Sequence, residues 1–248
     1  MASATNRSAI ARGSGASTHR RKTTIVRGAR IETLEEGRPL VSARALELKN
    51  VIGCPYRNID LDIDQGEVFA LRGRNGSGKT ALLLTLAARM RPTAGTLEIM
   101  GRRMPKAAAD VRRSIGLALF EGLNDLSDAE RVADATAAEF ELYGRRPNRE
   151  DSISYLQEWG LDDLASSRVG DLSRKQLVVL GIALAWVGHP ALIVVDDIES
   201  QLTKKQSVEV MQLLLSFSRE RNVAFALGVL ERDLARMADN ALYLGEER

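Results

Sequence analysis

The chain has 248 residues, 44% of them apolar and only 4% aromatic, which suits one globular domain with an aliphatic core. Its single cysteine, Cys54, excludes an intrachain disulfide, and its longest apolar runs, such as residues 177–187, are well short of the roughly 20 residues that a membrane-spanning helix needs. The formal net charge is +2, but residues 1–31 carry seven basic side chains and no acid, so the remainder has a net charge of −5.

The first 40 residues are predicted to form a disordered basic tail. They are rich in Ser, Thr, Ala, Gly and Arg, and they show no sustained apolar periodicity. Three interpretations of the tail remain open: a solvated extension, a segment attracted to anionic lipid or nucleic acid, and an organellar targeting peptide.

From residue 44 onward, strands and helices alternate. Strands are predicted at residues 44–49, 58–63, 68–72, 96–100, 191–195, 223–228 and 241–244. Helices are predicted at residues 81–90, 128–143, 149–159, 173–187 and 204–221. Because the helical stretch between about residues 105 and 180 interrupts this alternation, the pattern predicts an α/β sheet with an inserted helical subdomain.

The segment between the strand at 68–72 and the helix at 81–90 matches the pattern G-x-x-x-x-G-K-[ST] in full. It consists of Gly73, Arg74, Asn75, Gly76, Ser77, Gly78, Lys79 and Thr80. Glycines let the backbone wrap around phosphates, and the loop N–H groups and the following helix N-terminus point at the anion. In this pattern Lys79 reaches the β- and γ-phosphates, and the Thr80 hydroxyl ligates Mg²⁺. The sequence therefore predicts a site for ATP and Mg²⁺.

Two carboxylates, Asp196 and Asp197, follow the fully apolar strand at residues 191–195. A carboxylate at the end of a buried strand beside a phosphate loop helps to hold Mg²⁺, and we assign this role to Asp196. The adjacent Asp197 is the candidate base that polarises the attacking water.

Two spans resemble the ATP-binding subunits of ABC (ATP-binding cassette) transporters. The first is GEVFALRGRNGSGKTALLLTLAARMRPTAGTLEI, residues 66–99, and the second is residues 168–197. The phosphate loop alone indicates only a P-loop NTPase, whereas Leu172-Ser173-x-x-Gln176, placed about twenty residues before Asp196, is similar to the family's signature segment. The resemblance covers roughly residues 44–247.

The resemblance implies a P-loop NTPase core with a mostly parallel sheet, a small antiparallel β subdomain and the inserted helical subdomain. It also implies that two such chains pair head to tail, as a homodimer or a heterodimer, with the signature segment of one closing on the γ-phosphate held by the other. The trans-signature residues would be Ser173, Arg174, Lys175 and Gln176. A coupling helix of an integral-membrane permease would dock near the junction of core and helical subdomain.

The signature and the base depart from the family pattern. The family signature is Leu-Ser-Gly-Gly-Gln, so Arg174 and Lys175 replace two glycines. These cations either favour phosphate or are simply solvated, and both interpretations remain open. Asp197 stands where the family has a glutamate. Its carboxylate should be displaced by about 1.5 Å, one C–C bond, and a displacement of about 1 Å costs on the order of 10²-fold in rate.

Further departures concern the residues that orient water and sense phosphate. Phe120 stands where the family has a glutamine, with Glu121 beside it as a candidate substitute. The family's late histidine should fall near Val229 or Leu230, and neither histidine of the chain does so. The one near the described motifs, His189, is expected to be a surface turn residue.

Three other family positions also differ. Thr203 replaces an aspartate of the D-loop, and Val179 and Leu184 replace arginines of the signature helix. Tyr56 is the only aromatic residue available to stack on adenine, although a packing role is favoured.

The sequence thus predicts retained binding of Mg-ATP with weakened hydrolysis. The first hypothesis is the ATP-binding subunit of an ABC membrane transport system, held at the cytoplasmic face through its permease. The alternative is an ATP-gated scaffold or regulator that does not turn over. A P-loop small-molecule kinase would not explain the signature-like segment, and no specific nucleic acid is expected as a partner.

Overall fold

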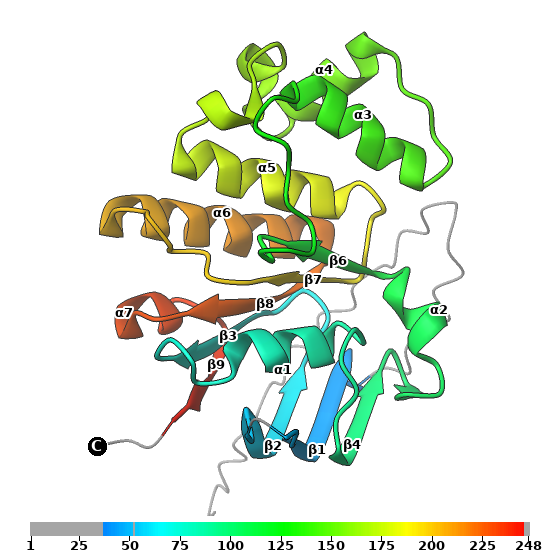
Figure 1. Ribbon diagram of the computed structural model, residues 1–248, viewed down its shortest axis with the longest axis vertical. Helices are drawn as coiled ribbons and strands as arrows, with labels where there is room; N and C mark the ends of the chain where they lie inside the picture. Colours follow the sequence, from blue (N-terminus) through cyan, green and yellow to red (C-terminus); the bar gives the residue numbers. More distant parts are fainter. Residues whose placement is uncertain (1–36, 52, 246–248) are drawn as a thin grey trace, which may run out of the picture. The chain divides into compact units, whose positions relative to one another are not determined.

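The computed structural model describes residues 37–51 and 53–245, which form two β-sheets with helices around them (Figure 1). The tail predicted for residues 1–40 lies outside the described residues as far as residue 36. No helix within the described ranges is long and apolar enough to cross a membrane.

The smaller sheet is antiparallel, with strand order β2-β1-β4-β5. Its strands are β1 (Val41–Leu48), β2 (Tyr56–Ile63), β4 (Ala94–Ile99) and β5 (Arg102–Arg103). The pairing of β1 with β2 shifts register between Ala43 and Leu46. This irregularity interrupts the two-residue alternation of buried side chains, which explains why the sequence pattern placed the start of the strand three residues too late.

The larger sheet has five parallel strands in the order β6-β7-β8-β3-β9. They are β3 (Val68–Gly73), β6 (Ile115–Ala118), β7 (Leu192–Val195), β8 (Ala224–Val229) and β9 (Asn240–Leu244). All residues of β7 and β8 are buried, as expected for central strands covered on both faces. Because the strands are parallel, their carboxyl ends meet at one edge of the sheet.

Helices cover both faces of the parallel sheet (Figure 1). Helix α1 (Lys79–Leu86) packs on the face that carries Phe69 and Leu71 of β3, through apolar residues that include Leu82 and Leu83. Helices α5 (Arg174–Trp186), α6 (Lys204–Arg221) and α7 (Arg232–Ala235) contribute to the core on the opposite face, which carries Val68 and Ala70. The alternation of β3 side chains therefore divides the interior into two apolar layers.

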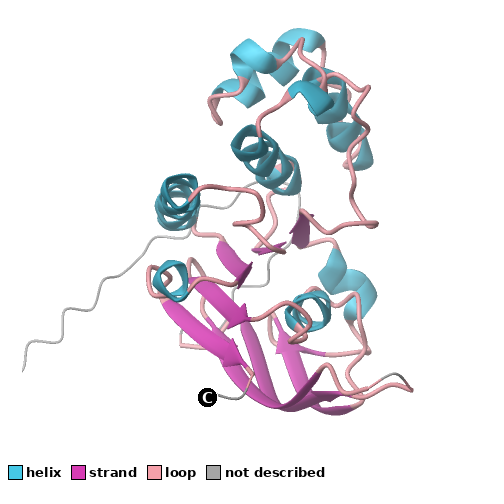
Figure 2. Cartoon of the chain, turned by 60° about the vertical axis from the view of Figure 1, so that its left-hand side comes forward, coloured by secondary structure: helices cyan, strands magenta, loops and turns pink. Residues whose placement is uncertain are grey.

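Further helices lie on the side of α5 away from the sheet (Figures 1 and 2). They are α3 (Val132–Leu142) and α4 (Arg149–Gln157), followed by two short 3₁₀ turns at Asp162–Leu164 and Val169–Asp171. Asn148 and Asp151 form a capping box at the start of α4. Together with α2 (Ala108–Arg112), these elements occupy the segment in which the sequence predicts a helical subdomain.

The α/β fold with a mostly parallel sheet is confirmed, but some elements were missed. Strands β5 and β6 and helices α2 and α7 are short, and β6 contains Gly116. A Cβ on Gly116 would lie 2.4 Å from the carbonyl oxygen of Ala185, so the glycine permits close packing of α5 on β6. Helix α1 ends at Leu86 rather than at residue 90, and Ala88 adopts a left-handed φ of 55° soon after it.

Candidate nucleotide-binding site

Part of the predicted site, namely the phosphate loop, Asp196 and Asp197, gathers at the carboxyl edge of the parallel sheet, where β3 and β7 end. A cleft of about 1280 Å³ opens there between the core and the helices of the segment 105–180. It is lined by residues of the phosphate loop, the two aspartates after β7 and the start of α5, among them Lys79, Thr80, Asp196, Asp197 and Arg174. The carboxyl edge of a parallel α/β sheet is the usual place for a ligand in such folds.

Glycines shape the phosphate loop between β3 and α1. Gly76 and Gly78 have φ values of 78° and 95°, which L side chains rarely adopt. A Cβ on Gly78 would lie 2.1 Å from the carbonyl oxygen of Pro55, and one on Gly73 would lie 2.3 Å from Ser77 Oγ. The hydroxyl of Ser77 is buried against Gly73, with no hydrogen-bond partner among the described residues. The loop conformation therefore requires the glycines that the pattern supplies.

Lys79 fixes the loop from within. Its side chain is 8% exposed, and its Nζ donates to the carbonyl oxygens of Gly73 at 2.7 Å and Arg74 at 3.1 Å. The ammonium group thus sits inside the curve of the loop, at the N-terminus of α1, where an anion would be attracted.

Thr80 and Asp196 join the loop to the end of β7. The Thr80 hydroxyl donates to Asp196 Oδ2 at 2.6 Å, while Asp196 Oδ1 is buried without a hydrogen-bond partner among the described residues. Burial raises the pKa of Asp196, the negative charge of Asp197 adds to the rise, and the bond from Thr80 opposes it. A cation would relieve this buried carboxylate, so the pair fits Mg²⁺.

The described residues hold no group of three or more His, Cys, Asp or Glu side chains that could form a complete metal site on their own. Proteins commonly hold Mg²⁺ through one or two carboxylates plus phosphate oxygens, so Thr80 and Asp196 could hold the ion together with a nucleotide.

Gly228 makes the contact between Thr80 and Asp196 possible. In the strand order, β8 lies between β3 and β7, so the side chain of Asp196 must pass the end of β8 to reach the loop. A Cβ on Gly228 would lie 2.7 Å from Asp196 Oδ1. Sequence reasoning missed this residue, although a glycine within an apolar strand is itself a signal of close approach.

Asp197 is exposed and has a φ of 45°, in the left-handed region that Asp tolerates better than most residues. It borders the same cleft as Lys79 and Thr80. Any residue placed here must therefore adopt a left-handed backbone, whatever the length of its side chain.

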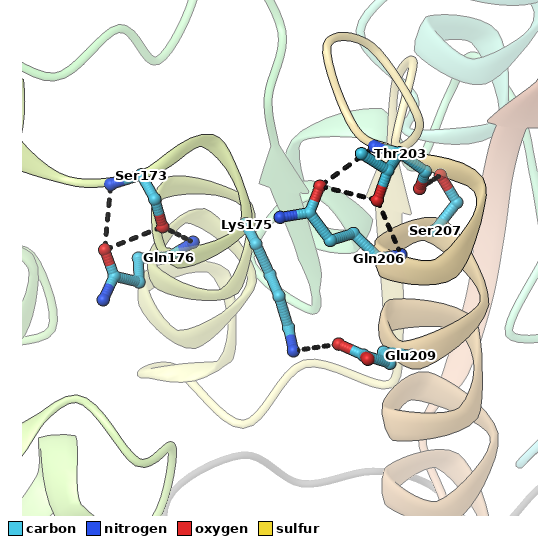
Figure 3. A network of polar contacts seen from close by, with 7 residues as sticks. All are labelled: Ser173, Lys175, Gln176, Thr203, Gln206, Ser207 and Glu209. Carbon is cyan, nitrogen blue, oxygen red and sulfur yellow. Dashed lines mark hydrogen bonds and ion pairs between the residues drawn. The ribbon is translucent and has the colours of Figure 1, made fainter.

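The signature-like residues make contacts within their own chain (Figure 3). Ser173 caps α5 in a capping box, in which its hydroxyl and its N–H both donate to Gln176 Oε1 at 2.8 Å. Arg174 Nε donates to the carbonyl oxygen of Ser200 at 2.9 Å, and Lys175 forms an ion pair with Glu209 of α6. Neither cation is merely solvated.

The replaced family positions lie in different surroundings. Phe120 is buried in the core, where Asn124 Oδ1 accepts from its N–H at 2.9 Å, and Glu121 lines the cleft. Leu230, near the expected histidine position, is 44% exposed. Thr203 caps α6 in a second capping box, with Gln206 (Figure 3).

Tyr56 packs into the protein, whereas His189 lies at the surface. Tyr56 is buried and shares a 2.7 Å hydrogen bond with Thr85 of α1, and burial raises its pKa to about 12. It is therefore unavailable to stack on a base, and the packing interpretation holds. His189 is exposed, has a left-handed φ of 48°, and places its ring edge-to-face against Trp186; partial desolvation by that contact lowers its pKa.

The sheet order, the glycine-rich loop and the Thr80–Asp196 pair define the class: a P-loop nucleotide-binding fold. The sequence profile of the ABC transporter family matches residues 56–200, which is more than half of the chain. The chain belongs to the ABC transporter family.

Relatives and solved structures agree. The chain is 33% identical over 177 residues to the methionine import ATP-binding protein MetN of Ralstonia nicotianae, covering 69% of this chain and 50% of the relative. It is 30% identical over 243 residues to MetN of Brucella abortus, covering 93% and 63%. The chain thus spans about half to two thirds of the length of these relatives.

Two solved structures show the same fold. One is cbiO1 from Clostridium perfringens, part of the ABC transporter complex cbiONQ, with a TM-score of 0.72, 21% identity and coverage of 84% of this chain and 85% of that one. The other is a dimeric post-hydrolysis state of the ATP-binding cassette MJ0796 bound to ADP and Pi, with a TM-score of 0.69, 22% identity and coverage of 82% and 94%.

Gly228→Ala should displace Asp196 and weaken the binding of ATP in the presence of Mg²⁺ by about tenfold, which corresponds to roughly 1.4 kcal/mol. Binding in EDTA should change little, because the substitution does not touch the loop. Titration calorimetry measures both constants. Gly53→Ala is the matched control, since a Cβ there meets nothing within 4 Å. Equal losses with and without Mg²⁺ would contradict the assigned role of Gly228.

Asp196→Asn should raise the thermal unfolding midpoint of the ligand-free chain by about 2 °C at pH 7, because it removes a buried charge. The raised pKa means that folded wild type holds this proton more tightly than the unfolded chain. The advantage of the variant should therefore shrink as the pH falls through the folded pKa, which thermal scans between pH 7 and 4.5 would show. A lower midpoint for the variant at pH 7 would refute this account.

Proposed function

We propose that this chain binds Mg-ATP at the carboxyl edge of its parallel sheet and serves as the ATP-binding subunit of a membrane transport system, hydrolysing ATP slowly. The observation that carries the proposal is the 2.6 Å hydrogen bond from Thr80 to Asp196, beside a loop already curved around Lys79. This contact joins the predicted phosphate site to the predicted cation site. The names of the relatives, which are import ATP-binding proteins, support the transport role.

Each site residue has a specific part in this function. Lys79 and the N–H groups of residues 73–80 bind the phosphates, and Thr80 and Asp196 hold Mg²⁺. When bound, Mg²⁺ neutralises charge that builds up on the transferred phosphoryl group. Asp197 orients the attacking water and accepts its proton during in-line attack on the γ-phosphate.

Slow turnover follows from Asp197 itself and from two other positions at which this chain departs from the family. Its carboxylate is one methylene short of a glutamate, and Phe120, buried in the core, has no polar atom with which to orient water. Leu230 offers no imidazole after β8. Phosphate binding depends on other residues and is retained.

A second function, an ATP-gated scaffold or regulator without turnover, is favoured by one observation. Arg174 and Lys175 make contacts within the chain, with Ser200 and Glu209, and so are engaged before any second cassette arrives. In that case ATP would close a dimer and signal by binding alone.

The partners we propose are an integral-membrane permease and a second ATP-binding cassette, identical or different. Exposed apolar side chains in the cleft support the first: Leu123 and Leu142 line it and are 59% and 78% exposed, and Tyr143 lies beside them. An amphipathic helix from the permease would cover them. The chain would then be held peripherally at the cytoplasmic face of the membrane.

Asp197→Glu should raise the turnover of ATP about tenfold, because the added methylene restores most of the missing reach while the left-handed backbone limits the gain. Affinity for Mg-ATP should stay within about twofold. Steady-state phosphate release from the purified chain, alone and with its permease, measures the rate. Lys79→Ala sets the background. If wild type and Asp197→Glu both bind Mg-ATP but neither exceeds that background in either setting, the scaffold function replaces the enzyme.

Leu142→Glu should abolish co-purification with a multi-span membrane protein from detergent-solubilised membranes, because a carboxylate in the apolar part of the cleft would be desolvated by a docked helix. Mass spectrometry of the purified complex provides the readout. Val208→Glu is the control, since Val208 is exposed on α6 outside the lining of the cleft. Equal recovery of the membrane protein with wild type and Leu142→Glu would rule out this docking surface.

A further inference from the structure

The turn between β7 and α6, residues 197–202, has an unusual backbone. Asp197 and Gln201 have φ values of 45° and 61°, both in the left-handed region. Within the turn, the N–H of Ser200 donates to the carbonyl of Asp197 and that of Leu202 to the carbonyl of Glu199, each at 3.1 Å. Residues in this conformation persist when their surroundings hold them there, so the contacts made by the turn are informative.

Arg174 holds the turn from the side of α5. It is the first residue of that helix, half-buried, and its Nε donates to the carbonyl oxygen of Ser200 at 2.9 Å. A carbonyl bonded to a guanidinium is a charge-assisted contact, stronger than a neutral one. A glycine at position 174 would have no side chain with which to make it.

Glu199 holds the same turn from the side of β8. Its Oε1 accepts hydrogen bonds from the N–H groups of Leu230 and Glu231, the latter at 2.9 Å. Residues 230 and 231 connect β8 to α7. One carboxylate oxygen therefore satisfies two backbone donors that a neutral side chain would hold less strongly.

These contacts form one continuous path. It runs from the start of α5 through Arg174 to Ser200, then through the adjacent Glu199 to the backbone of Leu230 and Glu231. Next to Glu199 in the turn, Ile198 is fully buried, and its N–H donates to the carbonyl of Gly228 at 3.4 Å. Asp197 is the residue next to this anchored segment, on the side of the cleft.

A neighbouring ion pair links α5 to α6 without touching the turn. Lys175, the next residue of α5, reaches Glu209 of α6 across the gap between the two capping boxes (Figure 3). Arg174 and Lys175 thus bind different parts of the chain, and only Arg174 holds the turn itself.

We propose that Arg174 and Glu199 are positioning residues that clamp the turn 197–202 from two sides. The clamp fixes Asp197 relative to the phosphate loop and transmits displacement of α5 to residues 230–231. This inference rests on the proposed function, because it assigns to that site a means of sensing where α5 lies.

The test uses the full chain with Arg174→Met, which keeps the aliphatic stem but removes the donor, and with Glu199→Ala. Hydrogen exchange of residues 198–202 and 230–232 is measured with and without Mg-ATP. Both variants should exchange about tenfold faster at 198–202, and Mg-ATP should no longer slow exchange at 230–232. Glu199→Gln, which keeps the acceptor oxygen, should recover most of the protection.

Arg221→Met is the matched control. Arg221, the last residue of α6, likewise joins distant segments, through an exposed ion pair at 3.0 Å with Glu158 at the end of α4. It should leave exchange at 198–202 unchanged. In steady-state assays, Arg174→Met should lower kcat about tenfold with KM within about twofold, whereas Arg221→Met should change neither.

Several outcomes would overturn the clamp. These are unchanged exchange at 198–202 in Arg174→Met, the same acceleration in Arg221→Met, or faster exchange with kcat and the Mg-ATP protection of 230–232 both intact. Failure of the proposed function is distinguishable. If wild type does not bind Mg-ATP, that function falls, while unliganded exchange still decides whether the clamp exists.

Discussion

The structure of this site depends on one hydrogen bond, from Thr80 to Asp196. The bond crosses the carboxyl end of β8, a strand that neither residue follows. The loop follows β3 and the aspartate follows β7, with β8 between them. The bond forms because residue 228 has no side chain to block it. The bond therefore depends on the strand order, on Gly228 and on the half-buried carboxylate of Asp196 together. Asp197 lies at the same edge because it follows Asp196 in the chain.

The same edge explains how unlike residues come to act together. Asp197 and Ser200 follow β7 and Leu230 follows β8, and these parallel strands end on the same side of the sheet. Arg174 enters this region from α5, a helix that is far away in sequence from β3. In the positions where the family carries glycines, this chain carries cations that contact its own turn and its own α6. The replacement of the two signature glycines by cations therefore adds two contacts within the chain.

Much of this could be predicted from the sequence, because strong local patterns decide it. The phosphate loop has a fixed spacing, and β7 is a short β-branched run ending in two acids, so their meeting at one edge followed from the parallel sheet. The boundaries of α6 were predicted to the residue. Thr203, a residue type that favours the N-cap position, precedes the helix, and the basic Arg221 lies in its last turn. Two four-residue elements, β6 and α7, were not recognised: β6 is interrupted by Gly116, and α7 is a single helical turn with too few residues to show a helical period. Contacts of Arg174, Glu199 and Gly228 join distant segments, and no local pattern specifies them.

The position of Lys79 has a consequence for how a nucleotide would be captured. Its ammonium bonds to the carbonyl oxygens of Gly73 and Arg74, so contacts within the chain itself support the curved form of the loop. The conformational entropy of ordering the loop is lost when the chain folds and not when the ligand arrives. Binding then requires only that Lys79 exchange carbonyl partners for phosphate oxygens. This preorganisation leaves more of the intrinsic interaction energy for affinity, and it persists whatever the rate of the chemistry that follows.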